Sequence, residues 1–301
     1  MNIEGIKLML RQSKVLRLLL SPALALRRQG ARGRESVQNE MLDNLARLLG
    51  DDAIMTVREF RGSFAIGTRS DLFRVIVKTG GYEPELSRIC ACHVPADRDV
   101  IDVGANIGLY TVLFAKMLHG RKVLSIEPTP NALARLRRNI QLNGVQNKVT
   151  VFGGAASDRH GEAQINTVAG REEYSSLGSL SHPNIAGVHH EVIRVPSATI
   201  DSLALEHGLD PGFVKIDVEG MEHVVLGGMT EVLKTSRPVI LSELSDPLLK
   251  RNGSSSREVI QFIEGFGYRV TDPLNERLRP GQRAYGDILC VPVGRGAEKA
   301  G

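Results

Sequence analysis

The 301-residue sequence contains no tryptophan, and aromatic residues make up only 4% of it. Proteins that bind single-stranded nucleic acid stack the bases on aromatic side chains, so this shortage argues against that function. There are three cysteines, an odd number without a disulfide framework, which is typical of reduced thiols in the cytosol. Cys90 and Cys92 lack the two further ligands that zinc needs, and we interpret them as helix cysteines. We therefore expect a cytoplasmic protein.

Positive charge is scarce outside the first 34 residues. The net charge is +4, but residues 1–34 hold eight basic residues and one acid, a net of +7, which leaves −3 for the remainder. A mildly acidic body does not suit a nucleic-acid partner, and we expect none. The arm mixes leucines with regularly spaced bases, but it is too short and too charged to span a bilayer. This pattern predicts either a helix on an anionic membrane surface or a terminal extension that frays or packs on a partner.

The stretch DVIDVGANIGLYT, residues 99–111, predicts a buried strand, a glycine-rich turn and a helix. Open α/β folds bind nucleotides at the carboxyl ends of such strands. Asp102 lies near the end of the strand. Gly104 and Gly108 flank Asn106, and a glycine lets a ligand approach the backbone because it has no Cβ.

The third glycine of a dinucleotide-binding motif is missing from this turn. Asp102 would repel a pyrophosphate, whereas it would attract a sulfonium and an α-ammonium group. The loop therefore predicts S-adenosylmethionine as the cofactor rather than NAD.

Acidic residues also follow the next two predicted strands. Glu127 comes about 20 residues after the glycines, where a carboxylate can accept both ribose hydroxyls of an adenosine. Ser157 and Asp158 end a run of small residues, which predicts either an adenine site with Asp158 as acceptor or a Ser-Asp turn. Glu83 precedes Pro84 at a predicted helix start, where a carboxylate is favourable.

Ionisable side chains gather around two later strands. Glu219 and Glu222 are expected in the first turn of a helix, where they would complement its dipole. Lys215 and Asp217 belong to a buried strand and need partners or a ligand. Glu243 ends the following strand. We expect Asp217 to act as a general base, or to bind Mg²⁺ together with a neighbouring acid.

The remaining pattern divides the chain into four parts. Residues 1–34 form the basic arm, 35–79 a helix and a small β-element with strands at 64–66 and 72–77, 80–293 the main α/β domain, and 294–301 a disordered tail. Within the main domain, residues 159–194 and 272–287 are expected to be loops or edge hairpins. The histidine pair at 189–190 is not at metal-binding spacing.

Several of these motifs, in this order, resemble the FkbM-type methyltransferase family. The resemblance covers residues 80–245, with Ile200 as a small departure, and it rests on the following strings: Tyr82-Glu83-Pro84, residues 100–108, Glu127-Pro128, Ala156-Ser157-Asp158, residues 199–203, residues 214–222, Leu226-x-Gly228 and Glu243.

The resemblance implies a class I, S-adenosylmethionine-dependent methyltransferase with a Rossmann-like three-layer sandwich and a mostly parallel seven-stranded sheet. It implies a hydroxyl acceptor on a sugar, a glycan or a secondary metabolite. Its cofactor residues would be Asp102, Gly104, Asn106, Gly108, Glu127, Ser157 and Asp158, with Glu83 toward the methionine end. Its substrate-side acids would be Asp217, Glu219, Glu222 and Glu243. We count these acids and Lys215 as the candidate catalytic residues.

Three alternatives stay open. The same fold could methylate nucleic acid or protein. The chain could be a non-catalytic cofactor-binding or scaffold protein tethered by its basic arm. An NAD-dependent oxidoreductase is the third, and it differs from the others in its cofactor.

Overall fold

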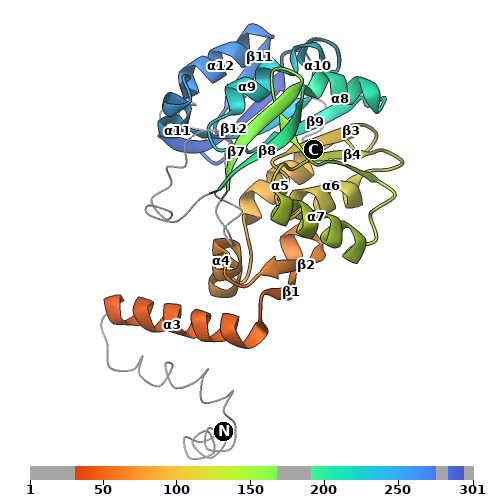
Figure 1. The fold of residues 1–301 in the computed structure, drawn as a ribbon. Helices are drawn as coiled ribbons and strands as arrows, with labels where there is room; N and C mark the ends of the chain where they lie inside the picture. The colour runs from red at the N-terminus through yellow and green to blue at the C-terminus, as the bar shows by residue number, and fades with distance from the viewer. Residues whose placement is uncertain (1–30, 168–190, 276–283, 295–301) are drawn as a thin grey trace, which may run out of the picture.

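The centre of the protein is a seven-stranded sheet with the order β11-β12-β10-β9-β3-β4-β5 (Figure 1). The computed structural model describes residues 31–167, 191–275 and 284–294. The strands are β3 (Asp99–Val103), β4 (Val123–Ile126), β5 (Val149–Phe152), β9 (Pro211–Ile216), β10 (Val239–Ser245), β11 (Tyr268–Thr271) and β12 (Tyr285–Pro292). Only β12 of these strands is antiparallel to its neighbours. The predicted class I, mostly parallel architecture is confirmed.

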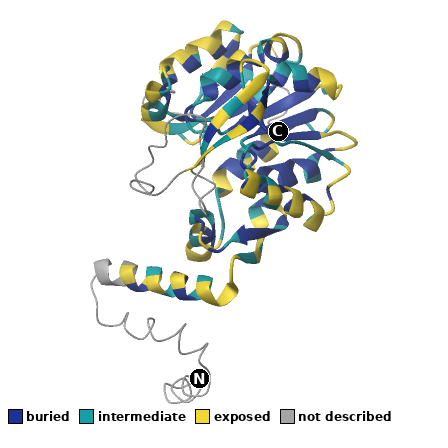
Figure 2. Cartoon of the chain, viewed as in Figure 1, coloured by how far each residue is buried: buried dark blue, intermediate teal, exposed yellow. Residues whose placement is uncertain are grey.

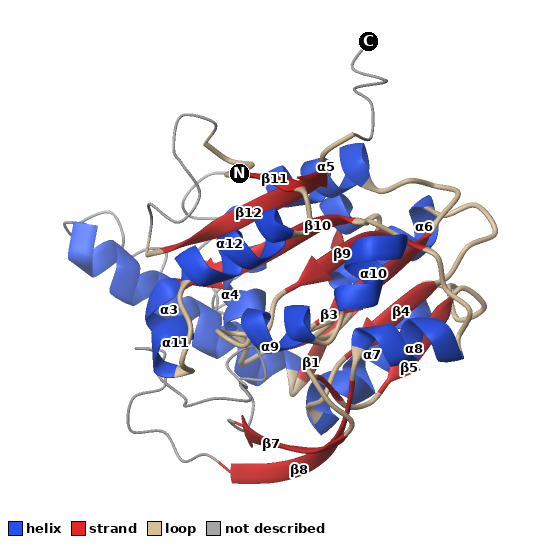
Figure 3. Cartoon of the chain, turned by 90° about the horizontal axis from the view of Figure 1, so that it is seen from above, coloured by secondary structure: helices blue, strands red, loops and turns tan. Residues whose placement is uncertain are grey.

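Helices cover both faces of this sheet (Figure 3). One face packs on α5 (Pro84–His93), α6 (Leu109–Met117) and α7 (Pro130–Leu142). The other packs on α8 (Ile200–Glu206), α9 (Glu222–Gly227), α10 (Thr230–Thr235), α11 (Asp246–Arg251) and α12 (Ser256–Gly265). Side chains alternate between the two layers, as Val100 and Ile101 show by joining different cores. Because both faces are covered, the central strands are buried (Figure 2) and most of their residues are apolar.

An N-terminal unit packs beside the α6 and α7 layer. It consists of α3 (Ala31–Leu49), β1 (Asp52–Val57), the 3-10 turn η2 (Arg58–Phe60), β2 (Gly62–Gly67) and α4 (Asp71–Thr79). The helix predicted over residues 35–50 is confirmed as α3. On α4, Lys78 donates to Asn39 of α3 at 3.0 Å, and Arg74 pairs with Asp43.

The strand predicted at residues 72–77 is wrong, because this segment is helix α4. The Ser70 hydroxyl accepts from the Phe73 amide at the helix start, and Gly80 ends the helix with φ at +82°. Phe73 and Ile76 are buried on one face. The apolar residues lie at helical spacing, and the capping residues on either side decide against a strand.

A smaller sheet follows β5 in the chain and has the order β6-β8-β7. It consists of β6 (Ala155–Ala156), β7 (Gly161–Thr167) and β8 (Glu191–Ala198). The ends of the predicted edge hairpin at 159–194 are therefore strands, while residues 168–190, with the histidine pair, lie outside the described part. The loop predicted at 272–287 extends too far, because β12 already begins at Tyr285.

Two other predictions about the termini fall largely on residues outside the description. The basic arm is described only from residue 31, where its last residues belong to α3, and the tail from 295 is not described. Within the described residues, no helix is both long and apolar enough to cross a membrane.

The position of β3 determines where a ligand can bind. It pairs with β4 on one side and with β9 on the other. The chain first adds β4 and β5 on one side of β3 and later crosses to add β9 on the other side. Such a reversal of strand order opens a crevice at the carboxyl ends of the strands. Asp102 and Gly104 lie at that point.

Asn139 of α7 joins the N-terminal unit to the glycine turn. Its side chain accepts from the Ala65 amide at 2.7 Å and donates to the carbonyls of Ala65 and Ile107 at 3.2 and 2.8 Å.

Asn139→Ala leaves these buried groups unpaired, and we expect a loss of about 2–3 kcal/mol in the free energy of unfolding. Urea unfolding measures it. The exposed Gln141→Ala on the same helix is the control, and equal stabilities of the two variants would contradict this role.

Candidate active site

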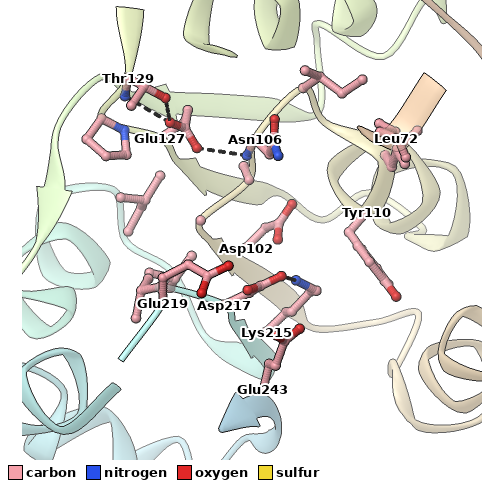
Figure 4. Close-up of a pocket in the computed structure, with 18 of the residues that line it drawn as sticks. Leu72, Asp102, Asn106, Tyr110, Glu127, Thr129, Lys215, Asp217, Glu219 and Glu243 are labelled. Atoms are coloured by element: carbon pink, nitrogen blue, oxygen red, sulfur yellow. Dashed lines mark hydrogen bonds and ion pairs between the residues drawn. The ribbon is translucent and has the colours of Figure 1, made fainter. Parts of the chain in front are cut away.

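A cavity of about 340 Å³ lies at the carboxyl ends of β3, β4 and β9 (Figure 4). Its walls come from elements far apart in the sequence. The charged side chains that line it are Asp71, Glu83, Asp102, Glu127, Lys215, Asp217, Glu219 and Glu243. Seven acids thus share the cavity with one lysine.

Asp102, on β3, is fully buried. Its Oδ2 accepts from the Thr111 hydroxyl at 2.6 Å, and that hydroxyl also contacts Ser125 at 2.8 Å. Oδ1 has no hydrogen-bond partner among the described residues. Burial raises the pKa of Asp102, and the nearby Lys215 opposes the rise. Since this oxygen is itself buried, Asp102 would act on a ligand in the cavity through its negative charge.

Glu127 follows β4 and is held on both oxygens. Oε2 accepts from the Asn106 amide at 2.8 Å, and Oε1 accepts from the amide of Thr129 at 2.8 Å and from its hydroxyl. Burial raises the pKa of Glu127, and these hydrogen bonds oppose the rise. Asn106 adopts φ of +47°, which directs its amide to the carboxylate. Oε1 thus accepts two hydrogen bonds, whereas Oε2 accepts one and keeps a lone pair for a ligand.

The two glycines of the turn also make room for the chain itself. Gly104 has φ of +77°, and a Cβ there would lie 1.9 Å from the carbonyl oxygen of Asp217. Gly108 has φ of +90°, and a Cβ there would lie 2.6 Å from Leu136 Cδ1. Gly104 lines the cavity, whereas Gly108 is not among the lining residues. The glycine turn therefore locks the end of β3 against the end of β9.

The position of Glu83 before α5 predicts that its carboxylate interacts with the start of that helix, but the structure gives it another partner. It adopts φ of +42° and makes no side-chain cap of the helix. Its Oε2 accepts instead from the Tyr110 hydroxyl at 2.7 Å. The carboxylate lies at the cavity wall.

Lys215 and Asp217 form an ion pair at the end of β9. Lys215 Nζ lies 2.8 Å from Asp217 Oδ2 and 4.6 Å from the centre of the Tyr110 ring. The lysine is 7% exposed. Burial lowers its pKa, but the carboxylates of Asp217, Asp102 and Glu83 outweigh burial and raise the pKa above its usual value. The lysine is therefore a permanent ammonium.

Asp217, Glu219 and Glu243 form a cluster that we name the acid triad. One oxygen from each lies within 4.8 Å of the other two. Burial, followed by repulsion from Asp217, raises the pKa of Glu219 to about 8 and also raises that of Glu243. Tyr285 of β12 donates a hydrogen bond to Glu243. The triad can hold a proton or a cation near neutral pH.

The helix-dipole interpretation of Glu219 is wrong. Helix α9 begins at Glu222, and Glu219 lies in the preceding turn with φ of +52°. This turn directs Glu219 into the cavity. Glu222 does lie in the first helical turn, where its Oε1 accepts from the Gly220 amide at 3.1 Å. It is buried away from the cavity lining, and burial raises its pKa to about 7.

Ser157 and Asp158 are not among the residues that line the cavity. Asp158 is exposed, and Arg159 lies 3.6 Å from it. Of the segment that follows β5 in the chain, three apolar residues line the cavity: Ala155, Ala156 and Ile165.

Several lining residues were missed by reasoning from the sequence. Leu72 and Val75 come from α4, which the sequence predicted as a strand. Tyr285 comes from a segment expected to be loop. Tyr110 was expected only as an apolar helix residue, although a buried tyrosine needs a partner for its hydroxyl, and that requirement could have singled it out.

Comparison with known proteins matches residues 102–270 to the methyltransferase FkbM domain. The chain belongs to the FkbM methyltransferase family. It is 27% identical over 180 residues to the 2-O-methyltransferase NoeI of Sinorhizobium fredii, covering 56% of this chain and 72% of that protein. It is also 27% identical over 203 residues to the 31-O-demethyl-FK506 methyltransferase FkbM of Streptomyces tacrolimicus, covering 58% and 75%.

A third relative is the hexuronic acid methyltransferase AglP of Haloferax volcanii. It is 27% identical over 197 residues, covering 62% of this chain and 72% of AglP. Family membership confirms an S-adenosylmethionine-dependent methyltransferase. The matched segment begins at Asp102, so α4 and Glu83 lie outside it.

This FkbM-family protein should gain stability when a carboxylate of the acid triad is removed at high pH. The pKa of Glu219 is raised in the folded state, so its ionisation opposes folding, and the loss of stability grows as pH rises from about 4.5 through about 8. We expect Glu219→Gln to gain roughly 2 kcal/mol at pH 8.5 and little at pH 4.5. Urea unfolding at both pH values measures the difference. Exposed Glu206→Gln is the control, and a pH-independent effect of Glu219→Gln would contradict the raised pKa.

Proposed function

We propose that this methyltransferase transfers the methyl group of S-adenosylmethionine to a hydroxyl oxygen of an uncharged sugar, glycan or secondary metabolite. The observation that carries the proposal is the acid triad, which lies across the cavity from Glu127 (Figure 4). One side of the cavity thus offers acceptors for a cationic nucleoside. The other offers bases for an alcohol.

The cavity fits the cofactor. S-adenosylmethionine supplies an electrophilic methyl group on a sulfonium when bound. Glu127, with both oxygens held by amides, suits the ribose hydroxyls. The carboxylate of Asp102 at the cavity wall suits a cationic ligand, since opposite charges attract strongly where water is excluded. The apolar wall of Ala155, Ala156 and Ile165 suits a flat ring.

The acid triad would orient the acceptor and remove its proton. An alcohol is a poor nucleophile while it is protonated, and a carboxylate within hydrogen-bond reach assists its attack. Asp217, the base expected from the sequence, has its Oδ2 engaged by Lys215 and is less available to a hydroxyl. Burial raises the pKa of Glu219 to about 8, which suits a group that takes up a proton near neutral pH. We assign the proton to Glu219 and orientation of the hydroxyl to Asp217 and Glu243.

Mg²⁺ is the alternative occupant of the triad, in which each carboxylate offers one oxygen. Lys215 already neutralises one of the three acids, so the proposal does not need an ion. Methyl transfer that survives EDTA supports the acid–base version, and transfer that returns only on adding Mg²⁺ supports the metal.

The excess of acids also bears on the acceptor. Seven acids and one lysine line the cavity, so an anionic acceptor would be repelled. The relative AglP is named for a hexuronic acid, and this chain's cavity favours a different, uncharged acceptor.

Cofactor binding tests the first half of the proposal. We expect S-adenosylhomocysteine to stabilise the protein against heat, and Glu127→Ala to weaken its affinity at least tenfold because the anchored carboxylate is lost. Isothermal titration calorimetry measures the affinity, with exposed Glu206→Gln as control. A folded protein that binds NAD but not S-adenosylhomocysteine would overturn the proposal.

Methyl transfer tests the second half. With labelled cofactor and a panel of glycosides, we expect label on neutral glycosides and at least tenfold less on the matching uronates. Glu219→Gln should lower kcat roughly a hundredfold, the usual contribution of a general base, without weakening cofactor affinity. Label on nucleic acid or protein alone, or full turnover by Glu219→Gln, would contradict the assignment.

A further inference from the structure

Lys215 is the one lysine or arginine among the described residues that line the cavity. Its charge cannot be screened by water, because only 7% of the residue is exposed. Two strands place it. It stands on β9 in register with Asp102 on the neighbouring strand β3, so the two side chains emerge side by side.

Two contacts hold the ammonium in place. Nζ binds Asp217 Oδ2 at 2.8 Å and lies 4.6 Å from the centre of the Tyr110 ring. That ring is itself fixed, because its hydroxyl donates to Glu83 at 2.7 Å. A cation against an aromatic face in a dry site is a favourable and directional contact.

The ammonium acts on acids at both sides of the cavity. Asp217 belongs to the acid triad, whereas Asp102 belongs to the wall proposed for the cofactor (Figure 4). The ionised form of Asp102 depends on this charge, because burial disfavours ionisation and one carboxylate oxygen has no partner among the described residues. The charged and titratable groups that interact with Lys215 or lie around it are Glu83, Cys90, Asp102, Tyr110, Asp217, Glu219, Glu243 and Asp287.

We propose that Lys215 is a positioning residue whose ammonium keeps Asp102 ionised and thereby determines the affinity for the cofactor at neutral pH. The proposal rests on the proposed function, since it takes S-adenosylmethionine as the ligand of Asp102. Lys215 acts through Asp102 and need not touch the cofactor. On the acceptor side of the cavity, the same ammonium neutralises Asp217.

Removing the charge should therefore move the pH dependence of binding. Without Lys215, burial favours the protonated form of Asp102 more strongly, and a neutral acid does not attract the α-ammonium group of the ligand. We expect Lys215→Met to bind S-adenosylhomocysteine at least tenfold more weakly at pH 7, with affinity recovering as pH rises. Lys215→Arg keeps the charge and should stay near the wild-type affinity. Titration calorimetry between pH 5.5 and 8.5 measures both.

A double-mutant cycle separates this role from a structural one. If Lys215 acts through Asp102, then Lys215→Met should cause little further loss of affinity in an Asp102→Asn background. Sinefungin, which carries an amine in place of the methylsulfonium, should show a larger loss than S-adenosylhomocysteine in Lys215→Met, because it has a second positive charge.

The outcomes are distinct. Equal weakening of Lys215→Met at every pH, or a full additional loss in the Asp102→Asn background, would overturn the proposal in favour of simple packing. If Lys215→Met does not fold by circular dichroism, the double variant Lys215→Met/Asp217→Asn removes both partners of the ion pair and carries the same test. Wild-type protein that binds neither ligand would instead overturn the proposed function.

Discussion

One buried ammonium among many carboxylates is the constraint on which the site depends. Lys215 and Asp102 lie in register on adjacent central strands, where neither can be hydrated. Charged groups at such positions are costly unless they are paired. Lys215 is paired in this way: its ammonium binds the carboxylate of Asp217 and lies against the ring of Tyr110. The Tyr110 hydroxyl in turn donates to Glu83.

Close approach of the backbone adds the rigidity that this arrangement needs. The carbonyl of Asp217 occupies the space that a Cβ of Gly104 would take, so the ends of β3 and β9 are in contact. The amide of Asn106 then reaches Glu127 across the turn. The acids therefore stand on strand ends and tight turns and not on a long loop, which favours a fixed geometry for methyl transfer.

The sequence predicted the main sheet and its acids well, because β3, β4, β9 and β10 are short, mostly apolar runs that end near a carboxylate. Asp102, Glu127, Asp217 and Glu243 could be placed at one edge of the sheet on that basis alone. The prediction from the sequence was wrong at residues 72–77, where the apolar residues fit both a strand and a helix. The caps at Ser70 and Gly80 favour the helix.

The error at Glu219 has an equally local cause. Glu219 was placed in a helix because acids near a helix start usually belong to its first turn, but two residues with positive φ delay the start of α9. For Asp158 the sequence left open an adenine site or a Ser-Asp turn. The chain turns there toward β7, and Asp158 is exposed and outside the cavity lining.

The sequence by itself determined the fold class, the glycine turn and the identity of the acids, because these depend on periodicity and on motifs that are contiguous in the chain. Only the tertiary structure decided which acids share a cavity and which charge balances them. Lys215, Tyr110 and Glu83 are far apart in sequence, and their contacts follow from the order of the strands in the sheet. Charge compensation inside a protein acts through space, so it can be seen only once the chain has folded.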